Sequence, residues 1–170
     1  MRLTWEQRKV EQISSTFSGG TPLVGNKEFY GGNIPFIRSG EIHNNFTELY
    51  ITEKGLNNSS AKLVKKGDIL YALYGATSGE VDISRINGAI NQAILAIIPN
   101  KNYNNIFITN YLKKEKDKII TTYLQGGQGN LSGEIIKNID LKIPDYREQI
   151  CVGSLLEKLD NLITLHQHNP

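Results

Sequence analysis

The chain has 170 residues, of which 39% are hydrophobic and 21% charged, and its net charge at pH 7 is +2. This length suits one domain with a short extension, and so weak a net charge does not by itself indicate a nucleic-acid-binding protein. No apolar stretch approaches the roughly 20 residues that span a bilayer, the charged N-terminus lacks an apolar signal core, and Cys151 is the single cysteine. We therefore expect neither a membrane segment nor an internal disulfide, and a cytoplasmic location by default.

The first part of the chain predicts short elements separated by glycine-rich loops. Residues 4–10 have capping-box spacing and predict a short helix, which a strand over residues 13–17 should follow. Glycine and proline then fix a loop at residues 18–22, and a second loop is expected over residues 26–33. Further along, a short apolar run ends at Arg38, and Thr52 is a suitable N-cap for a helix through Asn57.

The middle of the chain has stronger patterns. An apolar run at residues 69–74 predicts a buried strand, and helical spacing predicts a helix over residues 105–123. Shorter strands are expected at residues 81–83 and 93–98, a helical turn at residues 134–138, and a half-buried strand where Ile139, Leu141 and Ile143 alternate with polar residues. Together these elements predict an α+β domain of short mixed or antiparallel strands over residues 1–144.

Residues 145–170 predict one helix that extends from this domain. Asp145 is a good N-cap, and Glu148 stands where a capping box needs it. Apolar residues recur at spacings of three and four along the helix, and we expect them to meet another helix. The predicted helix interface consists of Leu155, Leu156, Leu159, Leu162 and Ile163. A helix folded back onto its own domain remains an open alternative.

Several loops combine glycine with amide, hydroxyl, basic or aromatic side chains. They lie at residues 19–21, 38–40 and 125–130, and residues 74–77 and 91–92 could belong with them. Arginine matches the two major-groove acceptors of guanine, glutamine and asparagine match adenine, and lysines and hydroxyls suit phosphate oxygens. Such loops could form a DNA-reading surface, but turn glycines with solvated amides would give the same pattern.

The sequence offers little for catalysis. Its histidines are His43, His166 and His168, and it contains no metalloprotease, nucleophile-elbow or P-loop motif. The carboxylates of Glu41, Glu80 and Asp82 are expected to be isolated at the surface, and the lysines of residues 113–118 to form a solvated helix face. We therefore expect no active site, no metal site and no cofactor.

In their order and spacing, the motifs of this chain resemble the specificity subunit of type I restriction–modification systems, over residues 5–167. The matching segments are WEQRK at 5–9, SGGTP at 18–22, IPFIRSGEI at 34–42, GDIL at 67–70, GATSG at 75–79, NQA at 91–93, IP at 143–144, EQ at 148–149 and LDNLITLHQ at 159–167. Phe17 and the following SGG segment faintly resemble a methyl-donor loop, but the catalytic tetrad of adenine methyltransferases is absent.

The resemblance implies a subunit that reads DNA and catalyses nothing. A full subunit of this family has two recognition domains, similar in fold to the target-reading domain of an adenine methyltransferase, held apart by two antiparallel helices. Each domain reads half of a split target, methylation subunits modify adenines, and a restriction subunit can join them. This chain carries one recognition domain and a short helix, so two copies related by a two-fold axis could form a homodimer through that helix.

These considerations predict specific contacts to double-stranded DNA. Base contacts are expected from Arg38, Gln125, Gln128 and Asn130, and also from Tyr74 and Gln92. Phosphate contacts are expected from Thr21, Lys27, Ser39, Thr77 and Lys114. Two alternatives remain open: a methyltransferase or nuclease with its own recognition domain, and an interaction module that competes for the methylation subunit.

Overall fold

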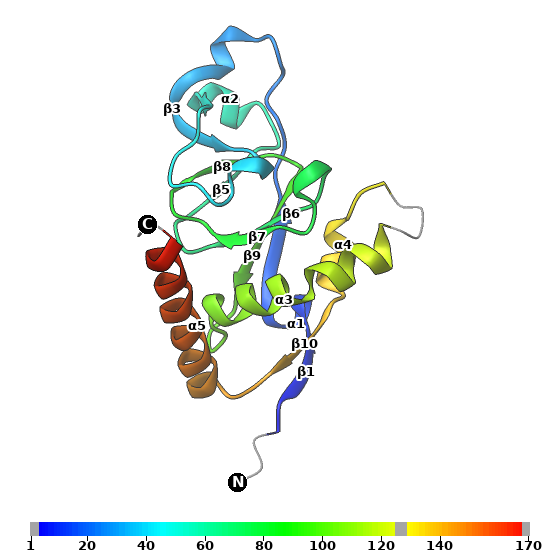
Figure 1. Cartoon of the computed structure of the whole chain (residues 1–170). Helices are drawn as coiled ribbons and strands as arrows, with labels where there is room; N and C mark the ends of the chain where they lie inside the picture. Colours follow the sequence, from blue (N-terminus) through cyan, green and yellow to red (C-terminus); the bar gives the residue numbers. More distant parts are fainter. Residues whose placement is uncertain (1–3, 125–128, 168–170) are drawn as a thin grey trace.

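A computed structural model describes residues 4–124 and 129–167. In these ranges the chain forms two four-stranded sheets, a two-stranded ribbon and several helices, and α5 runs along one side (Figure 1). The strands are β1 (Glu6–Lys9), β2 (Ser14–Ser18), β3 (Tyr30–Ile37), β4 (Tyr50–Ile51), β5 (Lys62–Val64), β6 (Ile69–Ala72), β7 (Val81–Ile83), β8 (Gly88–Ile90), β9 (Ile94–Pro99) and β10 (Asp140–Ile143). The α-helices are α1 (Val10–Ile13), α2 (Glu53–Asn57), α3 (Asn105–Tyr123), α4 (Gly133–Lys137) and α5 (Tyr146–Gln167), and the 3-10 turns are η1 (Lys27–Phe29), η2 (Ser39–Glu41) and η3 (Gly75–Thr77).

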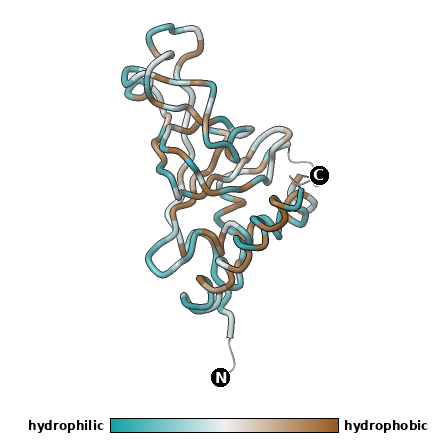
Figure 2. Tube along the Cα trace, turned by 60° about the vertical axis from the view of Figure 1, so that its left-hand side comes forward, coloured by the Kyte–Doolittle hydropathy of each residue, from teal (hydrophilic) through white to brown (hydrophobic). Residues whose placement is uncertain are grey.

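The antiparallel sheet β2-β9-β6-β7 lies between two hydrophobic cores. Ile69 and Tyr71 of β6 point into a core shared with α3, whereas Leu70 and Ala72 point into a core shared with the other sheet. Because both faces of β6 are covered, its sequence is continuously apolar instead of alternating. Figure 2 shows this concentration of hydrophobic residues in the middle of the molecule.

The second sheet has the order β4-β3-β8-β5 and lies above the first in Figure 1. Its strands β3 and β8 are parallel, while the other pairs are antiparallel. A separate small core of Phe36, Ile51, Ala61 and Ala89 supports it. The α+β class and the mixed, short-stranded sheets predicted from the sequence are therefore confirmed.

Several element predictions agree with the structure. Helix α3 has the predicted bounds, and its N-cap Asn104 accepts a hydrogen bond from the Phe107 backbone N–H at 2.9 Å. The Thr52 hydroxyl caps α2 by accepting from the Gly55 N–H at 3.0 Å. The alternating strand is β10, whose Leu141 and Ile143 are buried.

Two predictions near the N-terminus were wrong. Residues 4–10 do not form one helix, because Glu6–Lys9 pair with β10 as a strand. Residues 26–33 are not one continuous loop, because β3 begins at Tyr30 and a register shift between Tyr30 and Ile34 bends it around β4. Both segments are strands because of partners elsewhere in the chain, which local spacing does not reveal.

Helix α5 begins as predicted, but its capping box does not form. The Asp145 carboxylate accepts from the backbone N–H groups of Arg147 and Glu148, at 2.9 and 3.0 Å. The Glu148 side chain accepts from the Trp5 indole N–H at 3.3 Å instead of reaching back to the N-cap. This contact ties the start of α5 to the start of the domain.

One face of the first half of α5, formed by Gln149, Val152, Gly153 and Leu156, packs against the domain, contrary to expectation, whereas Ile150 and Leu155 remain exposed. Gly153 lies so close to α3 that a Cβ there would be 3.2 Å from the Asn104 side-chain oxygen, and the Gln149 side chain accepts from the Asn104 N–H at 2.9 Å. Leu156 is partly buried beside Trp5. From residue 157 onward every described residue is exposed, and we call residues 157–167 the outer half of α5.

The other predicted interface residues remain open to solvent. The exposed fractions are 58% for Leu155, 46% for Leu159, 59% for Leu162 and 55% for Ile163. None of the helices in residues 4–124 and 129–167 has the length and apolar character needed to cross a membrane.

Candidate nucleic-acid interface

Four loops meet at the ends of β6 and β9, and we call this cluster the loop junction: residues 19–21, 73–77, 91–93 and 130–131. Backbone hydrogen bonds join them: Gly19 N–H donates to Asn91 O at 3.2 Å, Leu73 N–H to Ala93 O at 2.8 Å, and Leu131 N–H to Leu73 O at 3.1 Å. These bonds fix the positions of side chains from four distant parts of the chain. The junction thus brings together three of the loops singled out in the sequence and Asn130, the last residue of a fourth.

Polar side chains in the loop junction face solvent. Thr21 and Gln92 are both exposed, and the Thr21 hydroxyl donates to the Gln92 carbonyl oxygen at 2.8 Å. Within the described residues the amide nitrogen of Gln92 has no intramolecular acceptor. The glutamine is therefore held by one end while its donor group remains available.

Tyr74, Thr77 and Asn130 belong to the same cluster. Tyr74 is the N-cap residue of η3 and is 37% exposed. Asn130 is exposed and precedes Leu131, which is buried and bonded to the backbone beside Tyr74. The structure thus places Thr21, Tyr74 and Gln92 close to Asn130, whereas Gln125 and Gln128 lie outside the described residues.

The glycines of the loop junction have structural roles. A Cβ at Gly19 would lie 1.8 Å from the Ile90 carbonyl oxygen, and Gly75 has a φ of 75°, a conformation that side chains disfavour. These glycines therefore have a structural role in the junction, and their presence does not by itself indicate a ligand.

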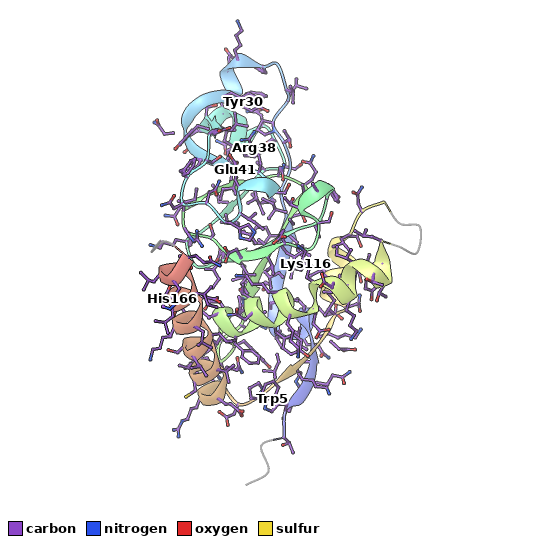
Figure 3. All side chains as sticks on the ribbon, viewed as in Figure 1. Trp5, Tyr30, Arg38, Glu41, Lys116 and His166 are labelled. Carbon is purple, nitrogen blue, oxygen red and sulfur yellow. The ribbon has the colours of Figure 1, made fainter. Side chains whose placement is uncertain are left out.

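Arg38 lies in a separate cluster with Glu41, Thr47 and Glu48, which we call the Arg38 cluster. Its guanidinium donates to both oxygens of Glu41, at 2.7 and 3.1 Å, and to Glu48 at 3.0 Å. Figure 3 shows Arg38 and Glu41 side by side. The hydrogen bonds from Arg38 to Glu41 and Glu48 raise the pKa of the guanidinium further. Glu41 and Glu48 thus accept several of the hydrogen bonds that Arg38 can donate, although Arg38 was predicted to contact a base.

Glu41 is buried and is not the isolated surface carboxylate that the sequence suggested. Besides Arg38, it accepts from the Thr47 hydroxyl at 2.9 Å and the Glu48 N–H at 3.3 Å. Burial alone would raise the pKa of Glu41, but these hydrogen bonds lower it to about 2. Glu41 therefore organises residues 38–48, and Ser39 lies within the turn that it holds.

Glu80 and Asp82 were also wrongly expected to be isolated. Asp82 lies 2.8 Å from His43 Nδ1 and 3.4 Å from Lys113 Nζ, and Glu80 pairs with Lys116. Burial would raise the pKa of Asp82, but the hydrogen bond with His43 and the charge of Lys113 lower it to about 2. Part of the predicted lysine face thus holds α3 against β7.

The remaining predicted phosphate contacts are scattered. Lys27 is exposed on η1. Lys114 has its Nζ 5.7 Å from the centre of the Tyr111 ring and lines a small apolar pocket with Trp5, beside the β1–β10 ribbon. Because the loop junction lies at the other ends of the sheet strands, the structure does not bring Lys114 to it.

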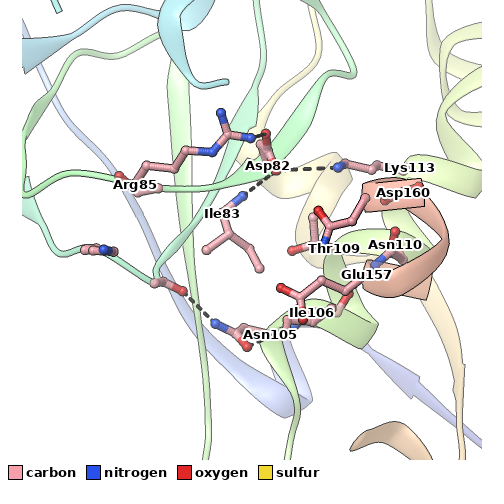
Figure 4. A pocket seen from close by; sticks show the side chains of 14 residues that line it. Asp82, Ile83, Arg85, Asn105, Ile106, Thr109, Asn110, Lys113, Glu157 and Asp160 are labelled. Atoms are coloured by element: carbon pink, nitrogen blue, oxygen red, sulfur yellow. Dashed lines mark hydrogen bonds and ion pairs between the residues drawn. The ribbon is translucent and has the colours of Figure 1, made fainter. Parts of the chain in front are cut away.

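A groove of about 420 Å³ lies between α3, β7 and α5 (Figure 4). Its walls carry charges of both signs, including Asp82, Arg85, Lys113, Glu157 and Asp160. Since Asp82 already pairs with Arg85 and Lys113, the groove does not select one charge of ligand. Residues 4–124 and 129–167 contain no group of three histidine, cysteine, aspartate or glutamate residues suited to a metal ion.

Leu23 and Val24, which follow Thr21 and are strongly exposed, were not among the predicted site residues. The available signal was an apolar pair between Pro22 and Gly25, two residues that favour a turn. Apolar side chains in an exposed turn cannot pack into a core. The position of this pair in the sequence could therefore have identified the two residues as candidate contact residues.

Comparison with protein families gives one model that covers nearly the whole sequence. Residues 3–170 match the type I restriction modification DNA specificity domain. Among curated proteins, the MjaIX specificity subunit of Methanocaldococcus jannaschii is 29% identical over 94% of this chain, and the HindI specificity subunit of Haemophilus influenzae is 29% identical over 91%. The chain spans only 38% and 36% of the lengths of these two relatives.

Solved structures with the same fold include the HsdS subunit of Thermoanaerobacter tengcongensis, with a TM-score of 0.73 and 15% identity, covering 97% of this chain and 39% of that one. A chain from a study of assembly and conformational transition in the type I R-M system gives a TM-score of 0.76 at 16% identity, over 97% of this chain and 40% of that one. At such identities the likeness concerns the fold alone.

Proposed function

The chain belongs to the type I restriction modification DNA specificity domain family, and from this membership we propose that it recognises one half-site of a split target in duplex DNA. The observation that carries this proposal is the loop junction, where hydrogen bonds gather four loops and present amide, hydroxyl and phenol groups to solvent. Such groups match base edges and phosphate oxygens.

Within this proposal the candidate residues have unequal support. Gln92, Asn130 and Tyr74 are proposed to contact bases, and Thr21 and Thr77 to contact phosphates. Lys27 is proposed as a further phosphate contact because η1 ends the loop that leaves the junction. Gln125 and Gln128 are proposed on the sequence alone. The remaining candidates lie outside the loop junction and so have less support: Arg38, Ser39 and Lys114.

We propose no catalytic role for the chain. Its curated relatives are named specificity subunits, which supports recognition over the alternative of a methyltransferase or nuclease with its own recognition domain. Modification of adenine would then require a methylation subunit, and cleavage a restriction subunit recruited through it. We further propose that residues 1–144 form the recognition domain and residues 145–170 the assembly helix.

The function can be tested by expressing this chain with a type I methylation subunit and mapping DNA methylation across the host genome. A split, adenine-containing motif that disappears without the chain is the expected result. Assembly of the two proteins without DNA binding would favour the competing interaction module. Methylation by the chain alone would favour the enzyme.

We also propose that two copies of this chain pair through α5, because apolar side chains of this helix face solvent. The exposed residues Leu155, Leu159, Leu162 and Ile163 support this pairing. Leu159→Glu should convert a concentration-dependent dimer into a monomer in sedimentation experiments, because it buries charge in an apolar seam.

Ile150→Glu is the matched control for this variant. The exposed fraction of Ile150 is 43%, close to the 46% of Leu159. The two residues are nine positions apart, which is two and a half helical turns, so Ile150 faces the opposite side of the helix. It should leave the dimer intact. A monomer in the unsubstituted chain at all concentrations would contradict the pairing.

A further inference from the structure

Two apolar side chains project into solvent beside the loop junction. Leu23 is 70% exposed and Val24 80%, more than any other large hydrophobic residue that the structure describes. They follow Thr21, which is hydrogen-bonded to Gln92 in the junction. The apolar pair therefore follows a residue of the loop junction directly in the chain, with only Pro22 between them.

The turn that carries the pair has a defined backbone. Before the pair, the carbonyl of the buried Pro22 accepts from the Tyr30 hydroxyl at 2.7 Å, which ties the start of the turn to β3. Within the turn, the Asn26 N–H donates to the Leu23 carbonyl at 3.3 Å. A backbone defined in this way lowers the entropic cost of presenting the two side chains to a ligand.

The charge around the pair suits a polyanion. Residues 18–27 contain Lys27 and no acidic residue, and the next carboxylate, Glu28, is paired with Lys54. DNA is a polyanion, so a turn with a lysine and no unpaired carboxylate nearby suits its surface.

We propose that Leu23 and Val24 contact the C5-methyl group of a thymine in the major groove of the half-site. The inference rests on the proposed function and adds a base that the amides of the loop junction do not read. Apolar side chains recognise thymine in this way because no other DNA base carries the methyl group. Thr21 and Lys27, on either side, would hold the adjacent phosphates.

Uracil provides the test, because it differs from thymine at this edge only by lacking the methyl group. Once methylation mapping has given the half-site, affinity is measured for the complex of this chain with the methylation subunit. Each thymine of the half-site is replaced by uracil in turn. At one position the unsubstituted protein should bind about fivefold more weakly, the effect of losing one buried methyl contact.

The variants Leu23→Ala and Val24→Ala identify the reader. At least one should weaken binding to the thymine site about fivefold and bind the thymine and uracil sites equally. Leu63→Ala is the matched control, because Leu63 is a similarly exposed leucine, at 56%, on β5 and outside the Leu23–Val24 turn. That variant should retain both the affinity and the uracil effect.

Several results would overturn the inference while leaving the proposed function standing. They are a half-site without thymine, no uracil effect at any position, or an undiminished uracil effect in both variants. An equal loss for thymine and uracil DNA would indicate a wedge between base pairs. Weaker assembly with the methylation subunit, with the uracil effect retained, would indicate a protein contact. Failure of the unsubstituted complex to bind any DNA would instead overturn the proposed function.

Discussion

The loop junction and the Arg38 cluster both carry polar side chains but use them differently. In the Arg38 cluster, Arg38 and Glu41 make several hydrogen bonds to each other and to the chain around them. In the loop junction, the backbone makes the connections and Gln92 shares one hydrogen bond with Thr21. The side chains of the Arg38 cluster therefore stabilise their own loop, whereas the loop junction keeps hydrogen-bonding groups that a ligand can use.

A substitution at Glu41 should test the structural half of this comparison and have the largest effect. Glu41→Gln should lower the free energy of unfolding at pH 7 by about 2 kcal/mol. The neutral amide removes the charge that pairs with Arg38 and replaces one of the two oxygens that accept hydrogen bonds at this site. Denaturant titration measures this change. Glu48→Gln, at a side chain that is 77% exposed, should change stability little.

The same variant has a pH signature. The pKa of Glu41 is lowered to about 2, so its stabilisation is present above the ordinary carboxyl pKa of 4.5 and is lost as the pH falls toward 2. In the Glu41→Gln variant, the free energy of unfolding should therefore fall less steeply as the pH is lowered from 4.5 toward 2. Equal stability of the variant and the unsubstituted protein at pH 7 would mean that the Arg38 cluster does not hold residues 38–48 in place.

A substitution at Gln92 tests the other half. Gln92→Ala should weaken binding to the cognate half-site about tenfold and relax the preference at one base pair, with stability changed by less than about 0.5 kcal/mol. Gel-shift titration against single-base variants of the half-site measures both effects. Gln7→Ala is the control, since Gln7 is an exposed glutamine on β1 at the far end of the domain (Figure 1). A uniform loss across all half-sites would assign Gln92 a positioning role.

Local sequence patterns predicted much of the fold but little of how polar side chains are used. The bounds of α3 and the burial of β6 follow from apolar spacing within each segment. The strand at residues 6–9 was missed because its partner β10 lies more than 130 residues away. The sequence likewise suggested a capping Glu148, because its competing partner Trp5 becomes a neighbour only on folding. The pairing of Glu41 with Arg38, three residues before it, was missed although both residues are local.

Loop composition identified the right segments for the junction without showing which of them meet. Residues 19–21 and 74–77 were chosen for glycine beside polar side chains and residues 91–92 for their amides, and the structure joins them. Residues 38–40 had the same composition, yet Arg38 binds carboxylates of its own loop. Whether a polar loop residue is free for a ligand depends on tertiary contacts, which composition does not encode.

The network at His43 is a smaller version of the Arg38 cluster, and its pH dependence has the opposite sign. The hydrogen bond with Asp82, aided by the charges of Asp82 and Glu80, raises the pKa of His43 above its ordinary value of 6.5 despite partial burial. The stabilisation is therefore complete below pH 6.5 and is lost as the pH rises through the raised pKa. His43 is 43% exposed, so solvent screening limits the effect to less than about 1 kcal/mol.

His43→Gln should remove this alkaline loss of stability. Urea titrations at pH 6 and pH 8.5 should show the unsubstituted protein less stable at the higher pH and the variant nearly unchanged between them. His166→Gln, at an exposed position on the outer half of α5, should keep the dependence of the unsubstituted protein. If His43→Gln retained that dependence, a group other than His43 would cause the alkaline loss of stability, and the role assigned to the histidine would be wrong.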